Sequence, residues 1–267
     1  MTDKIKIQAM AEALILARRD RRQIPPLRET YGLTDVADAQ AVQDLVTERG
    51  LAEGRRMVGR KIGLTSPAVQ AQMGVDEPDY GVLWAQDAYG DGDTLPTARF
   101  MQPRAEGEVA FVMARGIDDP NAGLTDLISA IDYALPALEI VDSAIADWNI
   151  GLVDTIADNA SGGAFALGTR PQKLDDLSLR LAGMTLSQNG KITSTGLGAA
   201  CMGHPLNATL WLARKMAQLG RPMAEGDVIL SGALGPMVSV AAGDVITLEI
   251  FGFEPLTIRF DTKGSAT

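Results

Sequence analysis

Residues 102–113 read Q-P-R-A-E-G-E-V-A-F-V-M, with Glu106 and Glu108 at the beginning of a predicted strand. Side chains two residues apart in a strand point to the same face of the sheet, and this face continues with Ala110 and Val112. Two like charges about 7 Å apart at the edge of a core repel each other and resist burial. A divalent cation would remove both costs. The alternative is a strand end open to water, where both carboxylates are hydrated.

A third carboxylate, Glu139, lies in L-P-A-L-E-I-V-D-S with apolar residues on both sides. A glutamate inside such a run is rarely buried without a partner. An ion pair with Arg104 is one interpretation, and a metal site shared with Glu106 and Glu108 is the other. Because the whole chain has one cysteine and one histidine, three carboxylates favour a hard cation such as Mg²⁺ or Mn²⁺ over zinc.

Two further charged residues stand in short glycine- or proline-containing segments. Lys61 lies between two glycines in G-R-K-I-G-L-T-S, and an isolated lysine is usually a surface residue. Asp79 follows Pro78 in D-E-P-D-Y-G, where a turn carboxylate is the default interpretation. The only histidine, His204, precedes Pro205 at a predicted helix start, which favours a structural role at least as much as a catalytic one.

Two loops have the small and polar residues that can present backbone N–H groups. Residues 158–163 read D-N-A-S-G-G and are either an anion-binding loop or only a turn. Residues 231–238 read S-G-A-L-G-P-M-V, follow a predicted strand and offer similar donors.

Composition and charge exclude several classes of protein. The 267 residues carry 24 Lys and Arg against 34 Asp and Glu, and the net charge of −10 argues against broad nucleic-acid binding. A single cysteine excludes an internal disulfide framework. We find no uncharged apolar window of about 18 residues and no convincing signal peptide, so we predict a cytoplasmic protein with no membrane-spanning segment.

The pattern of apolar residues predicts an α+β fold with a helical N-terminal part, residues 1–58, and a β-rich body, residues 59–267. Asn189-Gly190 is typical of a tight hairpin. We predict helices at 5–22, 34–49, 66–73, 124–133 and 205–219. We predict strands at 108–114, 135–141, 184–188, 228–231, 245–251 and 256–260.

Taken together, these segments resemble one known family. G-R-K-I-G-L-T-S, V-D-E-P-D-Y-G, Q-P-R-A-E-G-E-V-A-F-V, P-A-L-E-I-V-D-S, D-N-A-S-G-G and G-H-P-L-N-A occur in the order seen in the 2-keto-4-pentenoate hydratase and 4-oxalocrotonate decarboxylase family. That family lies within the fumarylacetoacetate hydrolase superfamily. The resemblance extends from about residue 10 to about residue 260.

The resemblance implies a fold, a metal site and two catalytic residues. The fold is a β-rich core with a rolled sheet, and members form homo-oligomers. Glu106, Glu108 and Glu139 fall on the family's Mg²⁺ or Mn²⁺ ligands, and Lys61 and Asp79 fall on its motif lysine and aspartate. The sequence leaves open which of these two residues donates and which accepts a proton.

The segment G-A-L-G-P-M-V resembles the hydratase branch, which implies water addition to 2-hydroxypenta-2,4-dienoate in meta-cleavage degradation of aromatic compounds. The product would be 4-hydroxy-2-oxopentanoate. We expect Asp158, Asn159 and Ser161 to line the substrate pocket and Leu234 to belong to its uncharged distal end.

Other functions stay open at this point. One is decarboxylation of 4-oxalocrotonate (2-oxo-3-hexenedioate), and another is C–C bond hydrolysis by an enzyme of the same superfamily. A third is a non-catalytic subunit, because family hydratases and decarboxylases associate with each other. A decarboxylase has to accept a second carboxylate, and the motif neighbours of Arg60 and Arg104 place these two cations nearer the metal end.

Overall fold

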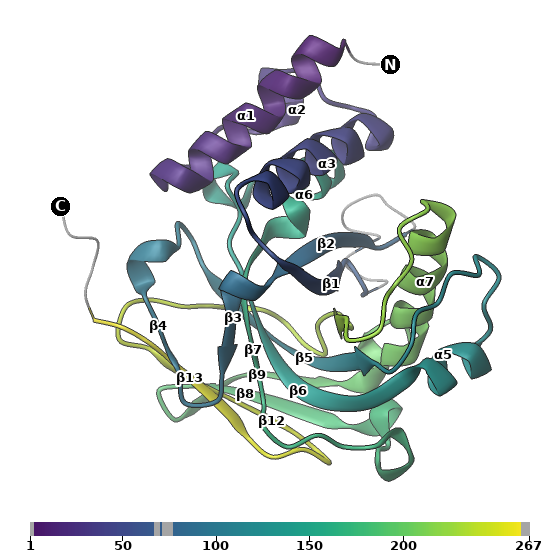
Figure 1. Cartoon of the computed structure of the whole chain (residues 1–267). Helices are drawn as coiled ribbons and strands as arrows, with labels where there is room; N and C mark the ends of the chain where they lie inside the picture. Colours follow the sequence, from purple (N-terminus) through teal and green to yellow (C-terminus); the bar gives the residue numbers. More distant parts are fainter. Residues whose placement is uncertain (1–2, 67–69, 71–76, 263–267) are drawn as a thin grey trace.

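The structure is a computed structural model that describes residues 3–66, 70 and 77–262 (Figure 1). Helices and two β-sheets share the chain, which confirms the predicted α+β class. The described helices are α1 (Lys4–Asp20), α2 (Leu27–Thr30), α3 (Val36–Ala52), α5 (Leu124–Ala130), α6 (Leu152–Ala157) and α7 (Pro205–Gln218). The short helix predicted at 66–73 falls mostly on residues outside the described ranges.

The larger sheet has eight strands and carries the candidate site. In spatial order its main path runs β2-β1-β10-β5-β6-β7-β3, and β11 pairs with β5 beside this path. Only the pairs β1–β10 and β3–β7 are parallel. The strands are β1 (Met57–Gly63), β2 (Asp79–Trp84), β3 (Ala88–Gly90), β5 (Arg104–Met113), β6 (Ile131–Val141), β7 (Gly162–Leu167), β10 (Val228–Leu230) and β11 (Val238–Ser239).

The smaller sheet has five strands in the order β4-β13-β12-β8-β9 and packs against the larger one. Its strands are β4 (Thr94–Leu95), β8 (Gly183–Gln188), β9 (Lys191–Leu197), β12 (Val245–Ile250) and β13 (Leu256–Phe260). The predicted Asn189-Gly190 turn joins β8 to β9, and both residues have positive φ, of 54° and 77°.

The two faces of β5 serve different purposes. Gly107 faces the smaller sheet so closely that an added Cβ would lie 2.5 Å from Leu248 Cδ1 and 3.3 Å from Met184 Cγ. The main hydrophobic core fills this side, between the two sheets and under α5 and α7. Since side chains alternate along a strand, Glu106 and Glu108 point to the opposite face, on the side of the N-terminal helices.

The N-terminal helices follow from local sequence signals. Asp35 begins α3 because its side chain accepts hydrogen bonds from the backbone N–H groups of Ala37 and Asp38. The helix predicted at 5–22 is present as α1, and its apolar stripe is buried at Met10, Ala11, Leu14 and Ala17. This stripe packs with α3 and with residues 144–157, which include α6, in a second core. Figure 1 shows α1, α2, α3 and α6 grouped at one end of the molecule.

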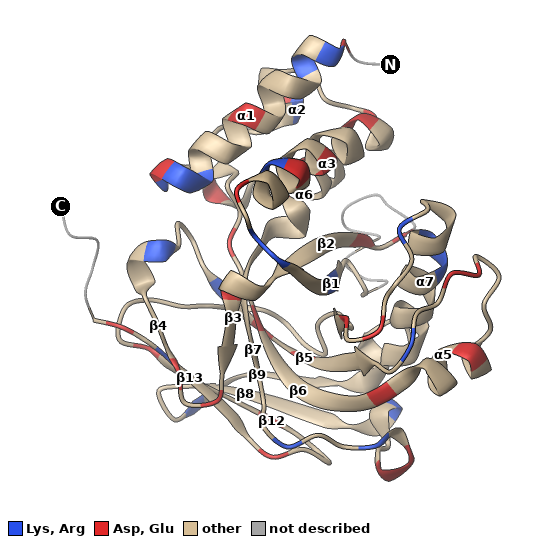
Figure 2. Cartoon of the chain, in the orientation of Figure 1, with Lys and Arg blue, Asp and Glu red and all other residues tan. Residues whose placement is uncertain are grey.

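The division of the chain at residues 58 and 59 stays a prediction, and the structure places that boundary inside β1. None of the described helices is long and apolar enough to cross a membrane. Figure 2 shows basic residues at the C-terminal end of α1, where Arg18 and Arg19 lie in the last turn.

Candidate active site

Two neighbouring strands bring three carboxylates together. β5 and β6 are antiparallel, and their register sets Glu106 directly opposite Glu139 and Glu108 opposite Ala137. Directly opposed residues share a face of the sheet, so the three glutamates project to the same side. One oxygen from each of Glu106, Glu108 and Glu139 lies within 4.8 Å of the others. This spacing suits several oxygen ligands around one hard cation.

The protein gives the carboxylates of Glu106 and Glu108 few hydrogen bonds and little opposite charge. Glu108 is fully buried, and its Oε2 accepts a 2.7 Å hydrogen bond from the backbone N–H of Gly232, whereas its Oε1 has no hydrogen-bond partner within residues 3–66, 70 and 77–262. Burial and the charge of Glu139 raise the pKa of Glu106 to about 7 and that of Glu108 well above its ordinary value. A bound divalent cation would satisfy the free oxygens and cancel the repulsion, so the donor set fits such an ion.

Lys61 projects from β1 into the same cluster. Its Nζ lies 3.0 Å from Glu139 Oε1, and the two side chains are 3% and 1% exposed. The surface-lysine interpretation is therefore wrong. Burial alone lowers the pKa of Lys61, but the charges of Glu139 and Asp79 outweigh it and raise the pKa above its ordinary value. Lys61 is thus a permanent cation in the ligand-free protein.

Asp79 begins β2 and lies beside Lys61 rather than in a surface turn. Its Oδ2 accepts a 3.1 Å hydrogen bond from Thr155 Oγ1, and its Oδ1 is buried without a hydrogen-bond partner in the part of the chain that the structure describes. A Cβ added to Gly63 would lie 2.2 Å from Asp79 Oδ1 and 3.6 Å from Lys61 Nζ, so only glycine leaves room for both groups. Burial raises the pKa of Asp79, and the nearby Lys61 charge lowers it in part.

A family model matches most of the chain. The family model described as the C-terminal region of fumarylacetoacetate (FAA) hydrolase matches residues 55–261. The chain belongs to the fumarylacetoacetate hydrolase family. The resemblance inferred from the ordered motifs is thereby confirmed.

Close relatives within the fumarylacetoacetate hydrolase family cover nearly the whole chain. A 2-keto-4-pentenoate hydratase of Paraburkholderia xenovorans (strain LB400) is 49% identical over 253 residues, which are 95% of this chain and 94% of that protein. A 2-hydroxyhexa-2,4-dienoate hydratase of Comamonas testosteroni is 39% identical over 97% of this chain and 99% of that protein.

A solved structure shares the fold over nearly the full length of both chains. The 4-oxalocrotonate decarboxylase of Pseudomonas putida G7, complexed with magnesium and adipate, superimposes with a TM-score of 0.94 at 33% identity. The match covers 97% of this chain and 99% of that one. It confirms the fumarylacetoacetate hydrolase-type fold with its N-terminal helices.

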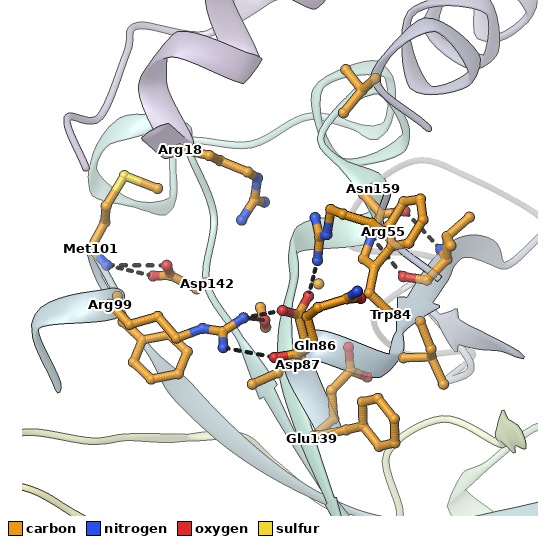
Figure 3. A pocket seen from close by; sticks show the side chains of 18 of the residues that line it. Arg18, Arg55, Trp84, Gln86, Asp87, Arg99, Met101, Glu139, Asp142 and Asn159 are labelled. Atoms are coloured by element: carbon orange, nitrogen blue, oxygen red, sulfur yellow. Dashed lines mark hydrogen bonds and ion pairs between the residues drawn. The ribbon is translucent and has the colours of Figure 1, made fainter. Parts of the chain in front are cut away.

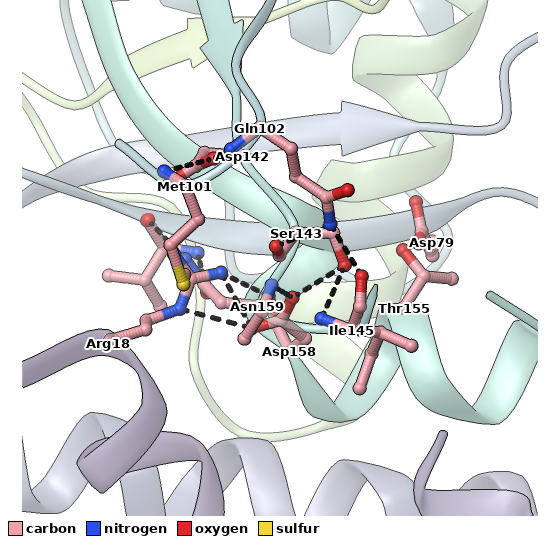
Figure 4. Close-up of polar contacts among 12 residues, drawn as sticks. Arg18, Asp79, Met101, Gln102, Asp142, Ser143, Ile145, Thr155, Asp158 and Asn159 are labelled. Atoms are coloured by element: carbon pink, nitrogen blue, oxygen red, sulfur yellow. Dashed lines mark hydrogen bonds and ion pairs between the residues drawn. The ribbon is translucent and has the colours of Figure 1, made fainter. Parts of the chain in front are cut away.

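Two side chains of the predicted substrate loop, residues 158–163, form hydrogen bonds with other parts of the protein (Figure 4). Asp158 Oδ1 accepts from Arg18 Nε and Nη2, and Oδ2 accepts from Ser143 Oγ and from the backbone N–H of Ala144. The amide of Asn159 pairs with the backbone of Val82, donating to its carbonyl and accepting from its N–H. Asp158 and Asn159 therefore hold the loop in place through their polar groups, and Asn159 also lines the cavity that reaches Glu139.

Ser161 is the loop residue whose side chain remains available. Its Oγ is buried, and no residue that the structure describes forms a hydrogen bond with it. Asn159, Ala160 and Ser161 all have positive φ, between 50° and 57°, which is uncommon for non-glycine residues and costs energy. The loop ends next to Lys61, because a Cβ added to Gly162 would lie 3.9 Å from Lys61 Cε.

Leu234 does not line the site in this structure. Its side chain is fully buried in the main core between the sheets, on the face of β5 opposite the carboxylates. Two backbone N–H groups of residues 231–238 already form hydrogen bonds within the protein: that of Gly232 donates to the Glu108 carboxylate, and that of Leu234 donates to the Gly107 carbonyl. The prediction of an uncharged pocket end built on Leu234 is therefore wrong.

A cavity of about 490 Å³ reaches Glu139 from the side of the N-terminal helices (Figure 3). Three of its arginines have carboxylate partners far away in the sequence: Arg18 binds Asp158, and both Arg55 and Arg99 bind Asp87. The sequence did not single out these residues, because their partners lie far apart in the chain.

Three other sequence-based assignments can now be placed. Arg104 stacks on Trp148 at 4.3 Å instead of pairing with Glu139. Arg60 projects from the face of β1 opposite Lys61, so it does not belong to the metal end. His204 caps α7, with Nδ1 accepting a 3.1 Å hydrogen bond from the N–H of Leu206.

Proposed function

We propose that this chain is a divalent-metal-dependent hydratase that adds water to 2-hydroxypenta-2,4-dienoate and releases 4-hydroxy-2-oxopentanoate. The observation that carries the proposal is the cluster of three carboxylates with Lys61 and Asp79, in a chain 49% identical to 2-keto-4-pentenoate hydratases. The names of these relatives also support a place in the degradation of aromatic compounds.

Glu106, Glu108 and Glu139 would hold the metal, with Mg²⁺ or Mn²⁺ as the proposed ion. Oxygen-only ligands suit both ions, and related structures contain magnesium, calcium or manganese. When bound, the ion supplies Lewis acidity to the 2-oxygen and carboxylate of the substrate.

Asp79 is the proposed proton carrier. Its buried Oδ1 is free to accept the enol proton of the substrate, and its raised pKa suits both uptake and release of a proton. Returning that proton to C5 gives a 2-oxo-3-enoate, which is electrophilic at C4. Water then adds at C4 and a proton is taken up at C3. Thr155 orients Asp79 through its 3.1 Å hydrogen bond.

Lys61 is the proposed electrostatic stabiliser. In the metal-free protein the charges of Glu139 and Asp79 raise the pKa of Lys61 and favour its charged form. A fixed ammonium group in a buried site stabilises the negative charge that develops on the substrate oxygen during both proton transfers. Ser161 Oγ, with no partner inside the protein, is a further proposed contact for the substrate.

The uncharged end of the substrate has an apolar wall beside the carboxylates. Phe165 lies directly opposite Glu139, and Ala137 lies opposite Glu108, so both side chains share the face of the metal cluster. Leu83, Leu135 and Leu230 pack with them in one apolar cluster. This wall, rather than Leu234, suits the vinyl group of a pentadienoate.

A second candidate function is decarboxylation of 2-oxo-3-hexenedioate, which the similarity to the 4-oxalocrotonate decarboxylase structure favours. That substrate brings a second carboxylate. Arg18, Arg55 and Arg99 in the cavity are already paired, which leaves Arg21 as the lining arginine without an ion pair to a described residue. The sequence identity is also lower, 33% against 49% for the hydratases. Hydration is therefore the better-supported proposal.

Product analysis separates the two functions. The purified protein is given the dienoate and 2-oxo-3-hexenedioate in separate reactions with Mg²⁺ or Mn²⁺, and 4-hydroxy-2-oxopentanoate and CO₂ are measured. We expect hydration of the dienoate. Efficient CO₂ release from the dicarboxylate, with no hydration of the dienoate, would overturn the assignment.

We further propose that the protein is a cytoplasmic homo-oligomer that associates with other enzymes of its pathway. The proposal rests on the family membership. Light scattering after size exclusion tests the oligomer, and a mass equal to the 28.3 kDa chain would contradict it.

A further inference from the structure

Arg60 is a buried cation on the far side of β1 from the candidate active site. Successive side chains of a strand point to opposite faces, so Arg60 projects away from its neighbour Lys61. Arg60 is only 5% exposed, yet within the described part of the chain its guanidinium forms no ion pair and no hydrogen bond. Burial lowers its pKa, which is the direction for a cation without an adjacent counter-charge. Such a group is unfavourable unless an anion joins it.

Tyr80 supplies a second unsatisfied donor on the same face. β1 and β2 pair with Arg60 opposite Val82 and Ile62 opposite Tyr80, which sets Arg60 and Tyr80 diagonally across the ladder. The Tyr80 side chain is 8% exposed, and its hydroxyl is buried with no hydrogen-bond partner among the described residues. A buried hydroxyl usually has such a partner.

Both donors line a cavity of about 340 Å³ between α3, the β1–β2 ladder and the C-terminal end of α7. Three of the other polar side chains that line it have partners, and Thr47 and the exposed Glu48 also line it. Gln43 donates to the Tyr80 carbonyl at 2.8 Å, and Asp44 forms an ion pair with Arg221. Apolar side chains form the rest of the wall: Leu51, Met57, Val82, Met216 and Pro222. Leu51 and Met57 are exposed at its edge.

We propose that this cavity binds a small monocarboxylate with an apolar body, held by the guanidinium of Arg60 and the hydroxyl of Tyr80. A carboxylate accepts two parallel hydrogen bonds from one guanidinium, and its remaining lone pairs can accept the Tyr80 O–H. A carboxylate would give the Arg60 guanidinium the ion-pair partner that it lacks among the described residues, while Asp44 and Glu48 lie on the side of Arg221. The apolar wall matches a hydrocarbon body and gives nothing to the extra charges and hydroxyls of an inorganic phosphate.

The site is separate from the carboxylate cluster but lies directly behind it. Arg60 and Tyr80 are the chain neighbours of Lys61 and Asp79, and the two pairs of side chains occupy opposite faces of the same two strands. The proposal does not depend on which reaction the active site performs.

Isothermal titration calorimetry with benzoate tests the proposal. The full chain is titrated in EDTA, so that no metal at the carboxylate cluster can bind the probe. Benzamide serves as the neutral analogue and inorganic phosphate as the anion without an apolar body. We expect saturable binding of benzoate to one site per chain and none of benzamide or phosphate at the same concentrations. Arg60→Met should weaken benzoate binding about tenfold or more, because it removes the bidentate charged partner.

Two further variants make the result specific. Tyr80→Phe removes only the hydroxyl and should weaken benzoate binding several-fold, and it covers the case in which Arg60→Met does not fold. Arg259→Met removes an exposed arginine from β13 in the other sheet and should leave binding unchanged. The proposal is wrong if benzoate shows no saturable binding, if both Arg60→Met and Tyr80→Phe bind it as the parent does, or if benzamide or phosphate binds equally well.

Discussion

Lys61 Nζ lies 3.0 Å from Oε1 of Glu139, and this ion pair is buried almost completely from water. The lysine comes from β1 and the glutamate from β6, and β10 and β5 separate these strands in the sheet. The ion pair therefore connects two strands that are not neighbours in the sheet. It links the residue proposed to stabilise charge with one of the residues proposed to bind the metal.

Replacing Lys61 by methionine should remove the charge and keep most of the side-chain volume. If Lys61 stabilises negative charge in the transition state, kcat should fall about 10²-fold, the usual cost of losing one such group. Steady-state kinetics on the dienoate measures the effect. Lys191→Met, at an exposed lysine of β9, is the matched control and should retain full activity. Unchanged kinetics in Lys61→Met would refute the role.

Asp79→Asn tests the proton carrier. Asparagine keeps the size of the side chain and can keep the hydrogen bond from Thr155, but it cannot take up or release a proton as the carboxylate does. We expect kcat to fall about 10²-fold or more, because a positioned acid–base group contributes that much, with little change in KM. Asp175→Asn, at an exposed position, is the control. A loss confined to KM would show that Asp79 only binds substrate.

Gly63→Ala tests whether the close approach at β1 positions the two proposed catalytic groups. The new Cβ would lie 2.2 Å from Asp79 Oδ1, so the carboxylate has to move. A misplacement of about 1 Å can lower the rate about 10²-fold. Metal binding should survive, since its ligands stand on β5 and β6. Gly183→Ala, where an added Cβ meets nothing within 4 Å, should have parental activity. Equal activity in both variants would contradict the positioning role.

Because His204 caps α7, we expect the free energy of unfolding to depend on pH, independently of catalysis. Its Nδ1 caps α7, and burial together with Arg180 lowers its pKa below 6.5. The unfolded chain therefore takes up a proton more readily than the folded protein. The capping contribution should be complete above about pH 6.5 and decline as the pH falls below that value.

The measurement is the free energy of urea unfolding between pH 5 and pH 8 for three proteins. His204→Asn keeps a capping oxygen without a titrating ring and should lessen the loss at low pH. His204→Ala should cost about 1 kcal/mol at pH 8. Identical pH profiles for the parent and His204→Asn would remove His204 as the source.

The spacing of Glu106 and Glu108 was enough to predict their shared face, because strand geometry is local. Their meeting with Glu139 depends on the register between β5 and β6, which no local pattern reveals. β1 escaped prediction because Arg60 and Lys61 are both buried, one on each face, and two adjacent charges hide the apolar period of a strand.

In the 158–163 loop and at Leu234, residue type alone did not predict what the side chains do. Asp158 and Asn159 have the residue types of a binding loop, but their partners Arg18 and Val82 lie far away in the sequence. Leu234 was expected near the substrate because its segment is apolar, and the same property places it in the core. Composition predicted a polar loop and an apolar segment, whereas long-range contacts decided what each of them does.

The most direct test of the account is the binding of Mn²⁺ to the metal-free protein, followed by the loss of the free-ion signal in electron paramagnetic resonance. We expect one Mn²⁺ per chain in the parent protein, and greatly weakened binding in Glu106→Gln and Glu108→Gln with the fold retained by circular dichroism. Glu225→Gln, at an exposed glutamate, should bind as the parent does. Undiminished binding of one Mn²⁺ by both Glu106→Gln and Glu108→Gln would contradict the account.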